Sequence, residues 1–178
     1  MRSSDLAIRH LVPEDAAVYR TLRLRGLKEH PDAFTSSHVE ESEKPLAATE
    51  RRLAPDSGDW VFGAFIANEL AGLAGLSREP RAKNRHKASV FGMYVAREHG
   101  RRGVGAALLR QVIDAARSQP GIEQLVLTVT DTNVAARTLY ENFGFRSFGV
   151  EPRAIRVNDG VNDVYHDKNH MILFLLLP

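Results

Sequence analysis

The spacing of apolar residues predicts a helix near the start of the chain. Val18, Leu22 and Leu27 recur at intervals that place their side chains on one face of a helix. Pro13 and the two acids after it suit a first helical turn, because proline presets φ and carboxylates favour the positive end of the helix dipole. We therefore expect a helix from Pro13 to about Glu29.

A second helix is expected where the sequence offers a capping box. Ser37 and Glu40 have the spacing at which a hydroxyl and a carboxylate each accept from the other residue's backbone amide at a helix start. Pro45 lacks an amide hydrogen, so it interrupts this helix, which is expected to continue to Leu53. Two further helices are expected at residues 103–118 and 133–142.

Apolar runs of strand length lie between and after these helices. Strands are expected at residues 7–10, 59–67, 70–77, 88–95, 125–130, 146–151, 154–157 and 170–176. The run 125–130 is almost continuously apolar, which is typical of a parallel strand buried on both faces. Asn68-Glu69 and Asn158-Asp159-Gly160 suit hairpin turns. The order of elements predicts an α/β fold in one domain, residues 1–178, with a mixed sheet and helices on both faces.

Composition is ordinary for a globular domain and excludes some classes of site. The chain has 178 residues, of which 43% are hydrophobic and 26% charged. It contains no cysteine, so disulfides and thiolate metal ligands are excluded, and no metal is expected. The start of the chain lacks the apolar core of a signal peptide, and the longest apolar run, residues 171–177, is about a third of a membrane span. We expect a cytoplasmic protein without a membrane partner.

Net charge is +2, with one basic cluster at residues 78–87 between two expected strands. A solvated loop is the favoured interpretation of this cluster, and attraction of an acidic ligand is the alternative. No aromatic platform accompanies the charge, so a nucleic-acid partner is not expected.

The segment from Gly100, GRRGVGAALL, follows an expected strand and continues into an expected helix. Its glycines allow close approach of the backbone, and the amides of the first helical turn together with the helix dipole suit a diphosphate. Arg101 and Arg102 add two positive charges. The segment is not a Walker loop, because no lysine follows its glycines, and Leu108 stands where a Rossmann fingerprint has a small residue.

A second motif begins at Asn133, after the next expected strand, and ends at Phe145. Together the two motifs resemble the GNAT superfamily of acyl-CoA-dependent N-acetyltransferases, most closely from about Phe62 to Phe145. The matching positions are Val95, Glu98, Arg102, Gly103, Val104, Gly105, Leu108 and Leu109, and then Asn133, Ala136, Leu139, Tyr140, Gly144 and Phe145.

This chain departs from the family pattern near the first motif. Arg97 stands where proline is usual, and Gly100 and Arg101 stand as if the usual arginine and glycine had exchanged places. Which of Arg101 and Arg102 reaches the phosphates with its side chain is therefore left open.

The resemblance implies a mixed, mostly antiparallel sheet in which a central parallel strand pair splays apart and acetyl-CoA lies in the gap. The pantetheine arm is expected to pair with the backbone of Met93, Tyr94 and Val95. The amide of Tyr94 or Val95 is expected to polarise the thioester carbonyl. The diphosphate is expected on the backbone amides of Arg101, Arg102, Gly103, Val104, Gly105 and Ala106.

The resemblance also implies roles for two residues of the second motif. Tyr140 matches the tyrosine that protonates the leaving thiolate in many members, and the alternative is a tyrosine that only packs on the sheet. Asn133 either contacts the cofactor, caps the following helix, or does both.

A general base is harder to assign. The strand in which many members carry a glutamate has no acid here. Glu40 and Glu41, in the helix expected to wall the acceptor site, are the candidates, with a capping acid or a solvated face as the alternative. His166 and Tyr94 are further candidates, and a water relay without a dedicated base is equally compatible with the sequence.

We predict an acetyl-CoA-dependent N-acetyltransferase that transfers acetyl directly, in a ternary complex, to a primary amine of a small molecule or of a peptide or protein. Because the chain has no cysteine, a cysteine-linked intermediate is excluded. The alternative is a catalytically silent CoA-binding sensor or regulatory module. The sequence does not identify the acceptor, and it leaves a homodimer open.

Overall fold

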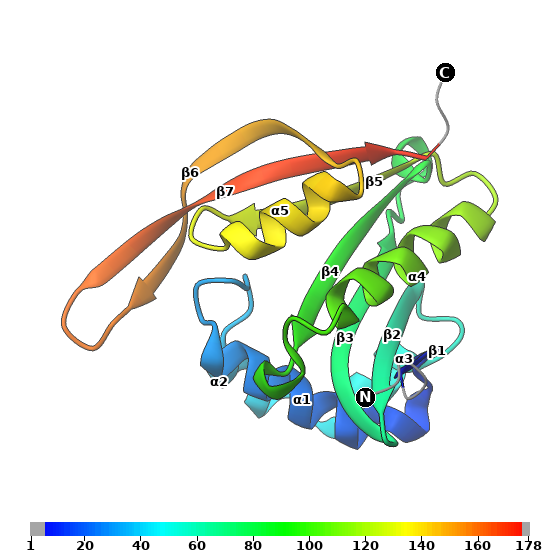
Figure 1. Ribbon diagram of the computed structural model, residues 1–178, viewed down its shortest axis with the longest axis horizontal. Helices are drawn as coiled ribbons and strands as arrows, with labels where there is room; N and C mark the ends of the chain where they lie inside the picture. Colours follow the sequence, from blue (N-terminus) through cyan, green and yellow to red (C-terminus); the bar gives the residue numbers. More distant parts are fainter. Residues whose placement is uncertain (1–5, 176–178) are drawn as a thin grey trace.

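All strands of residues 6–175, the part of the chain that the computed structural model describes, join one sheet (Figure 1). Its strand order is β1-β2-β3-β4-β5-β7-β6. Neighbouring strands are antiparallel except β4 and β5, which are parallel. The strands are β1 (Leu6–His10), β2 (Asp59–Ile66), β3 (Glu69–Arg78), β4 (Lys87–Val95), β5 (Gln124–Thr130), β6 (Arg146–Asn158) and β7 (Asp163–Phe174). The predicted mixed, mostly antiparallel sheet is confirmed.

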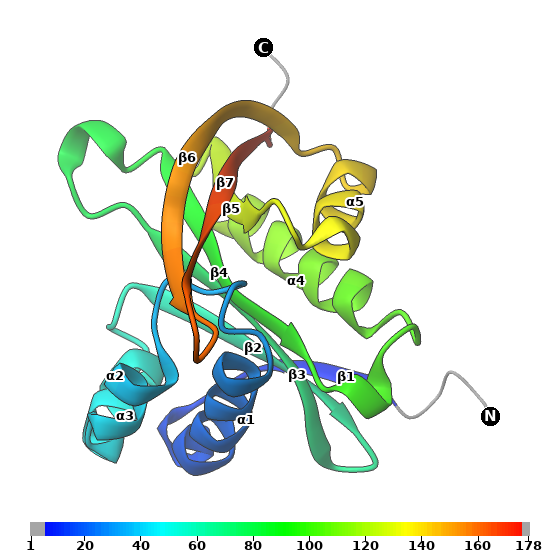
Figure 2. The same cartoon turned by 90° about the vertical axis from the view of Figure 1, so that its left-hand side faces the viewer.

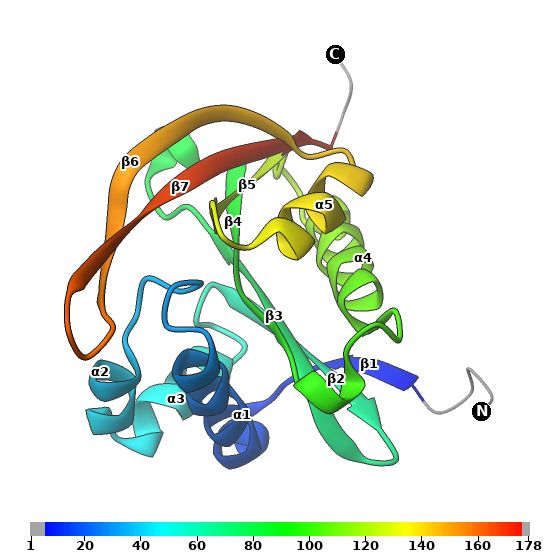
Figure 3. The ribbon, with the colours of Figure 1, turned by 60° about the vertical axis from the view of Figure 1, so that its left-hand side comes forward.

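Helices cover both faces of the sheet, as predicted (Figures 2 and 3). Helices α1 to α3 lie on one face, and α4 and α5 lie on the other. The helices are α1 (Ala16–Glu29), α2 (His38–Glu43), α3 (Leu46–Leu53), α4 (Val104–Ser118) and α5 (Val134–Asn142). No helix of the described residues is long and apolar enough to cross a membrane.

The core consists of two apolar clusters, one on each side of the sheet. Helix α4 anchors the larger cluster with one apolar stripe, on which Leu108, Leu109 and Val112 are fully buried. Burying such a side chain contributes roughly 1.5–3 kcal/mol. On the other face, α1 buries Tyr19 and Leu22 against β3 and β4. This packing fixes the start of α4 beside the end of β4.

The central parallel pair, β4 and β5, stays together only at its beginning. The two strands pair over Lys87–Ser89 and Gln124–Val126 and then separate. A β-bulge bends β4 at Gly92, where φ is +63°, a value that glycine adopts without strain. The predicted splay is confirmed, and it leaves backbone groups of both strands facing a gap.

The last two strands correct the prediction. β6 is a single strand with an irregularity between Glu151 and Ile155, not two strands, and β7 begins at Asp163, seven residues before the expected His170. Its expected end at Leu176 lies outside the described residues. Most of β6 is exposed, so the strand is defined by backbone pairing with β7 and not by an apolar face. Its sequence therefore shows only a weak apolar pattern, which is why the prediction divided it in two. The long hairpin extends beyond the rest of the sheet (Figure 1).

Smaller boundaries also differ from the sequence prediction. Pro45 separates two distinct helices, α2 and α3. The β2–β3 turn is centred on Ala67-Asn68, with φ of 50° and 67°, one residue earlier than expected. Two predicted features are confirmed, namely the Ser37–Glu40 capping box and the hairpin turn at Asn158-Asp159-Gly160.

Candidate functional site

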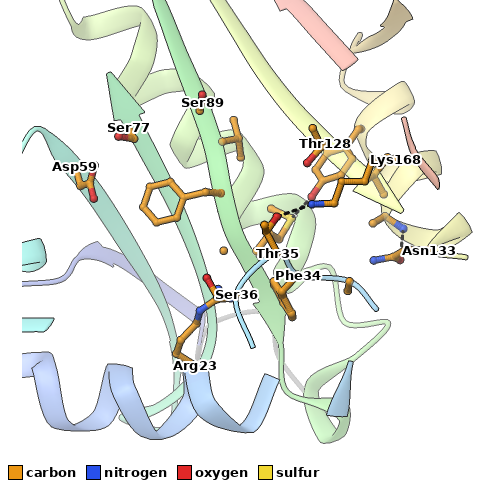
Figure 4. A pocket seen from close by; sticks show the side chains of 18 of the residues that line it. Arg23, Phe34, Thr35, Ser36, Asp59, Ser77, Ser89, Thr128, Asn133 and Lys168 are labelled. Carbon is orange, nitrogen blue, oxygen red and sulfur yellow. Dashed lines mark hydrogen bonds between the residues drawn. The ribbon is translucent and has the colours of Figure 1, made fainter. Parts of the chain in front are cut away.

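A cavity of about 420 Å³ lies where β4 and β5 separate (Figure 4). It exists because the two strands stop pairing and no strand fills the space between them. Elements from both faces of the sheet contribute to its wall. Among the lining residues are Arg23, Phe34, Thr35, Ser36, Arg52, Asp59, Gly92, Met93, Thr128, Asn133, Tyr140 and Lys168.

Tyr140 lines this cavity from α5. Its side chain is buried, and its hydroxyl lies 3.5 Å from the sulfur of Met93. The ring packs edge-on against Phe145, with 5.8 Å between the ring centroids. Burial raises the pKa of Tyr140 to about 12, so the hydroxyl keeps its proton at neutral pH. Both interpretations of Tyr140 therefore have a structural basis, since it is packed and it also presents a proton to the cavity.

Asn133 caps the start of α5. Its side-chain oxygen accepts a hydrogen bond from the Ala136 amide at 3.2 Å. The residue also lines the cavity. The capping role is thus observed, and a contact with a cofactor stays a prediction.

The backbone of β4 distinguishes the two amides expected to face a thioester. The Ala96 amide donates to the Ala71 carbonyl of β3 at 2.8 Å. Because amides alternate in direction along a strand, the Tyr94 amide points to β3 and the Val95 amide points into the gap. The Tyr94 side chain lies on the α1 side of the sheet, where its hydroxyl donates to Glu29 at 2.7 Å. Val95 is therefore the better placed of the two.

The glycine-rich loop has the backbone geometry of an anion site. Gly103, at φ +77°, is the N-cap residue of α4, and no side chain of the described residues caps this helix start. The amides of Val104, Gly105 and Ala106 belong to the first helical turn, which has no intrahelical acceptors for them. Arg101 and Arg102 are exposed beside them. The loop lies outside the cavity described above.

The loop and the cavity nevertheless adjoin one another at Gly105. A Cβ on Gly105 would lie 3.5 Å from a methyl carbon of Leu139 and 3.8 Å from one of Val95. Leu139 precedes Tyr140 in α5, and Val95 ends β4. The start of α4, the end of β4 and the helix with Tyr140 therefore meet at one point.

Arg101 shows a cost of the departure from the family pattern. Its φ is +59°, in the left-handed region that glycine adopts freely. For a residue with a side chain, this conformation is unfavourable by roughly 1–2 kcal/mol. The arginine thus stands at a position whose backbone favours glycine.

None of the proposed general bases lines the cavity. The Glu40 carboxylate accepts from the amide and hydroxyl of Ser37, and these hydrogen bonds lower its pKa. Burial favours the neutral form of Glu41, but the bond from Lys44 at 2.6 Å and nearby arginine charges outweigh it, so its pKa is also lowered. His166 lies 3.7 Å from Asp131, away from the cavity wall.

The sequence analysis missed three cationic residues of the wall, Arg23, Arg52 and Lys168. Arg23 lies over the ring of Phe34, 4.5 Å from its centroid, and Lys168 is buried and donates to the hydroxyl of Thr35. In the sequence each belongs to a segment rich in charged residues, so nothing local distinguishes it from a solvated side chain. No cluster of three or more metal-ligating side chains occurs among residues 6–175.

Comparison with known proteins finds relatives of this chain among the acetyltransferases. Residues 24–145 match the profile of the acetyltransferase (GNAT) family. The N-alpha-acetyltransferase RimI of Mycobacterium tuberculosis is 36% identical over 114 residues, 64% of this chain and 68% of that protein. The [ribosomal protein bS18]-alanine N-acetyltransferase of Escherichia coli is 34% identical over 135 residues, 76% of this chain and 88% of that protein. A GNAT-family acetyltransferase structure from Streptococcus pneumoniae, 24% identical, shares the fold with a TM-score of 0.84 over 96% of this chain and 99% of that one.

Proposed function

The chain belongs to the GNAT family and is an acetyl-CoA-dependent N-acetyltransferase, and we propose that it transfers the acetyl group directly to a primary amine within one ternary complex. The observation that carries this proposal is the hydroxyl of Tyr140, which lies in a cavity between splayed strands, 3.5 Å from Met93. The names of both relatives specify acetylation at nitrogen, and that of RimI an α-nitrogen.

The donor site that we propose uses mostly backbone groups. Acetyl-CoA supplies, when bound, an acetyl group activated as a thioester. The free amides at the start of α4 suit its diphosphate, because they point outward at the positive end of the helix dipole. The Val95 amide, directed into the gap, suits the carbonyl oxygen of the thioester. Gly105 lies close to Leu139 of α5 and Val95 of β4, which supports placing these two proposed sites next to one another.

Transfer requires one proton to leave the amine and one to reach the departing thiolate. The reaction forms a C–N bond and breaks a C–S bond, so the two protons balance. We assign the second proton to Tyr140, because its hydroxyl is buried, protonated and inside the cavity. We assign removal of the first to water, because Glu40, Glu41, His166 and the Tyr94 side chain all lie outside the cavity wall. Asp59, the one carboxylate among the described lining residues, is paired with Arg52 at 3.5 Å.

A direct assay tests this function. Mixed with acetyl-CoA and a panel of primary amines, the protein is expected to release free thiol only in the presence of an acceptor. Varying both substrates is expected to give intersecting double-reciprocal lines, as a ternary complex requires. Tight CoA binding without turnover on any amine would instead favour the silent sensor module, and parallel lines would contradict direct transfer.

The two loop arginines are expected to contribute unequally to CoA affinity. Arg102→Ala should weaken CoA binding by about three- to tenfold at low salt and by less at high salt, because exposed charge pairs are screened. Arg101→Gly removes the same charge but relieves the positive φ, so a smaller loss is expected. Calorimetry at two salt concentrations measures both effects. Arg117→Ala, at the far end of α4, is the matched control and should change neither.

The homodimer stays a prediction. β6 is an edge strand of the sheet, and Phe148 and Val150 on it are 62% and 61% exposed. An unpaired edge with apolar side chains is a surface on which a second copy can pair.

A further inference from the structure

The cavity has an excess of positive charge. Arg23, Arg52 and Lys168 line it, and among the described lining residues Asp59 is the only carboxylate. Asp59 lies 3.5 Å from Arg52, so the charges of these two largely offset one another. Lys168 donates to the neutral hydroxyl of Thr35. Arg23 and Lys168 thus form no ion pair among the described residues, although Glu41 near Arg23 and Glu151 near Lys168 partly offset their charges.

Of these two side chains, Arg23 has the more unusual environment. Its Nη1 atom is buried and has no hydrogen-bond partner among the described residues. The guanidinium lies against the ring of Phe34, 4.5 Å from the ring centroid. A buried charged donor without an acceptor is unfavourable, so a water, an ion or a ligand is needed to satisfy it, and at the wall of a cavity a ligand can take this place.

The bulge in β4 leaves space in front of this guanidinium. A Cβ on Gly92 would lie 4.0 Å from Nη1 of Arg23, and glycine has no such atom. The positive φ of Gly92 also turns the strand at this point. In Figure 4, Arg23 extends from α1 toward Ser36, at one end of the cavity, while Lys168 and Thr35 lie toward the other.

We propose that the acceptor is a small amine that carries a carboxylate, as a free amino acid does, and that Arg23 binds this carboxylate. Arginine presents parallel donors that match the two oxygens of a carboxylate. Lys168 adds to the positive potential of the same cavity. The charge of the wall disfavours a polyamine, and a peptide substrate would place a neutral amide at Arg23.

This inference rests on the proposed acetyl transfer to an amine, and matched substrates separate the two. Initial rates are measured for a panel of L-amino acids and for the corresponding amino-acid amides, at saturating acetyl-CoA. The wild-type protein is expected to prefer the acids by at least about tenfold in kcat/KM, because only they supply an anion to Arg23. The amine of an amide is less basic and so more often neutral, hence its reactivity works against this preference.

Two variants of Arg23 test the residue itself. Arg23→Met keeps the packing on Phe34 and should raise KM for the acids by about tenfold, with little change for the amides or for acetyl-CoA. Arg23→Lys keeps the charge without the fork and should give an intermediate KM. Lys28→Met removes one charge from the exposed face of the same helix and is the matched control. Arg23→Met is not expected to lower the melting temperature, because it removes an unpaired buried charge.

The outcomes are distinct. Equal rates on acids and amides, or equal loss on both in Arg23→Met, would overturn the carboxylate site and leave acetyl transfer standing. If no amine is acetylated, calorimetry with the amino acids decides: binding that Arg23→Met abolishes supports the site while the transfer fails, and no binding overturns the site.

Discussion

Tyr140→Phe is expected to reduce turnover by about 10²–10⁴-fold, the usual contribution of a positioned acid. The substitution keeps the ring and its edge contact with Phe145 and deletes only the hydroxyl that lies beside Met93. Acetyl-CoA affinity and the melting temperature should therefore change little. Steady-state kinetics, calorimetry and a thermal melt measure the three quantities on the same preparation.

A matched control distinguishes the chemistry from a general effect of losing a hydroxyl. Tyr165→Phe, on the projecting hairpin, keeps its ring under the Arg153 guanidinium and should leave turnover unchanged. Nearly normal turnover in Tyr140→Phe would mean that water protonates the thiolate. Parallel loss of turnover and CoA binding would make Tyr140 a cofactor contact.

If Tyr140 is the general acid, its raised pKa also predicts how turnover depends on pH. The phenol is the proton donor only below its pKa of about 12, so the acid function should persist as pH rises and fail only near that value. Relative to a thiol of pKa about 8.5, proton transfer from such a phenol is uphill by roughly 5 kcal/mol in the free site. Desolvation in the cavity also raises the pKa of the CoA thiol, which reduces the pKa difference between thiol and phenol. We expect no loss of turnover from Tyr140 in a pH profile up to about pH 10.

Gly103→Val is expected to weaken CoA binding by about 10²-fold. At φ +77° a β-branched side chain is strained, and relief of the strain would turn the first-turn amides of α4 away from the diphosphate. The loss of two charge-assisted hydrogen bonds at about 1.5 kcal/mol each corresponds to this factor. Calorimetry with CoA measures the affinity, and a thermal melt shows whether the variant is folded.

Gly58 provides the control for this substitution. Its φ of +82° is nearly the same, and a Cβ there would have no neighbour within 4 Å, as at Gly103. Gly58→Val should therefore show a similar loss of stability with unchanged CoA affinity. Unchanged affinity in a folded Gly103→Val protein would remove the phosphate-loop assignment.

The sequence by itself determined the features that depend on neighbouring residues. The apolar stripe of α4, the Ser37–Glu40 capping box and the glycine loop before α4 are all set by spacings within a turn or two of helix. The near-continuous apolar run of β5 predicted a parallel strand buried on both faces, and this was only partly right. Val126 is half-buried and Thr128 is exposed, because β5 pairs with β4 only at its start and then borders the cavity. These local patterns were sufficient to predict the mixed sheet and to identify the two motifs.

The tertiary structure alone decided the features that depend on distant residues. The cavity wall joins Arg23 of α1 to Lys168 of β7, and the bond from Lys168 to Thr35 spans 133 positions of the chain. No local pattern distinguishes these cations from solvated ones, and none shows that Glu40 and Glu41 face other partners. The direction of the Val95 amide follows from the register of β4 on β3, which pairing between strands sets. Burial and pairing between segments far apart in the chain therefore determine the chemistry of this site.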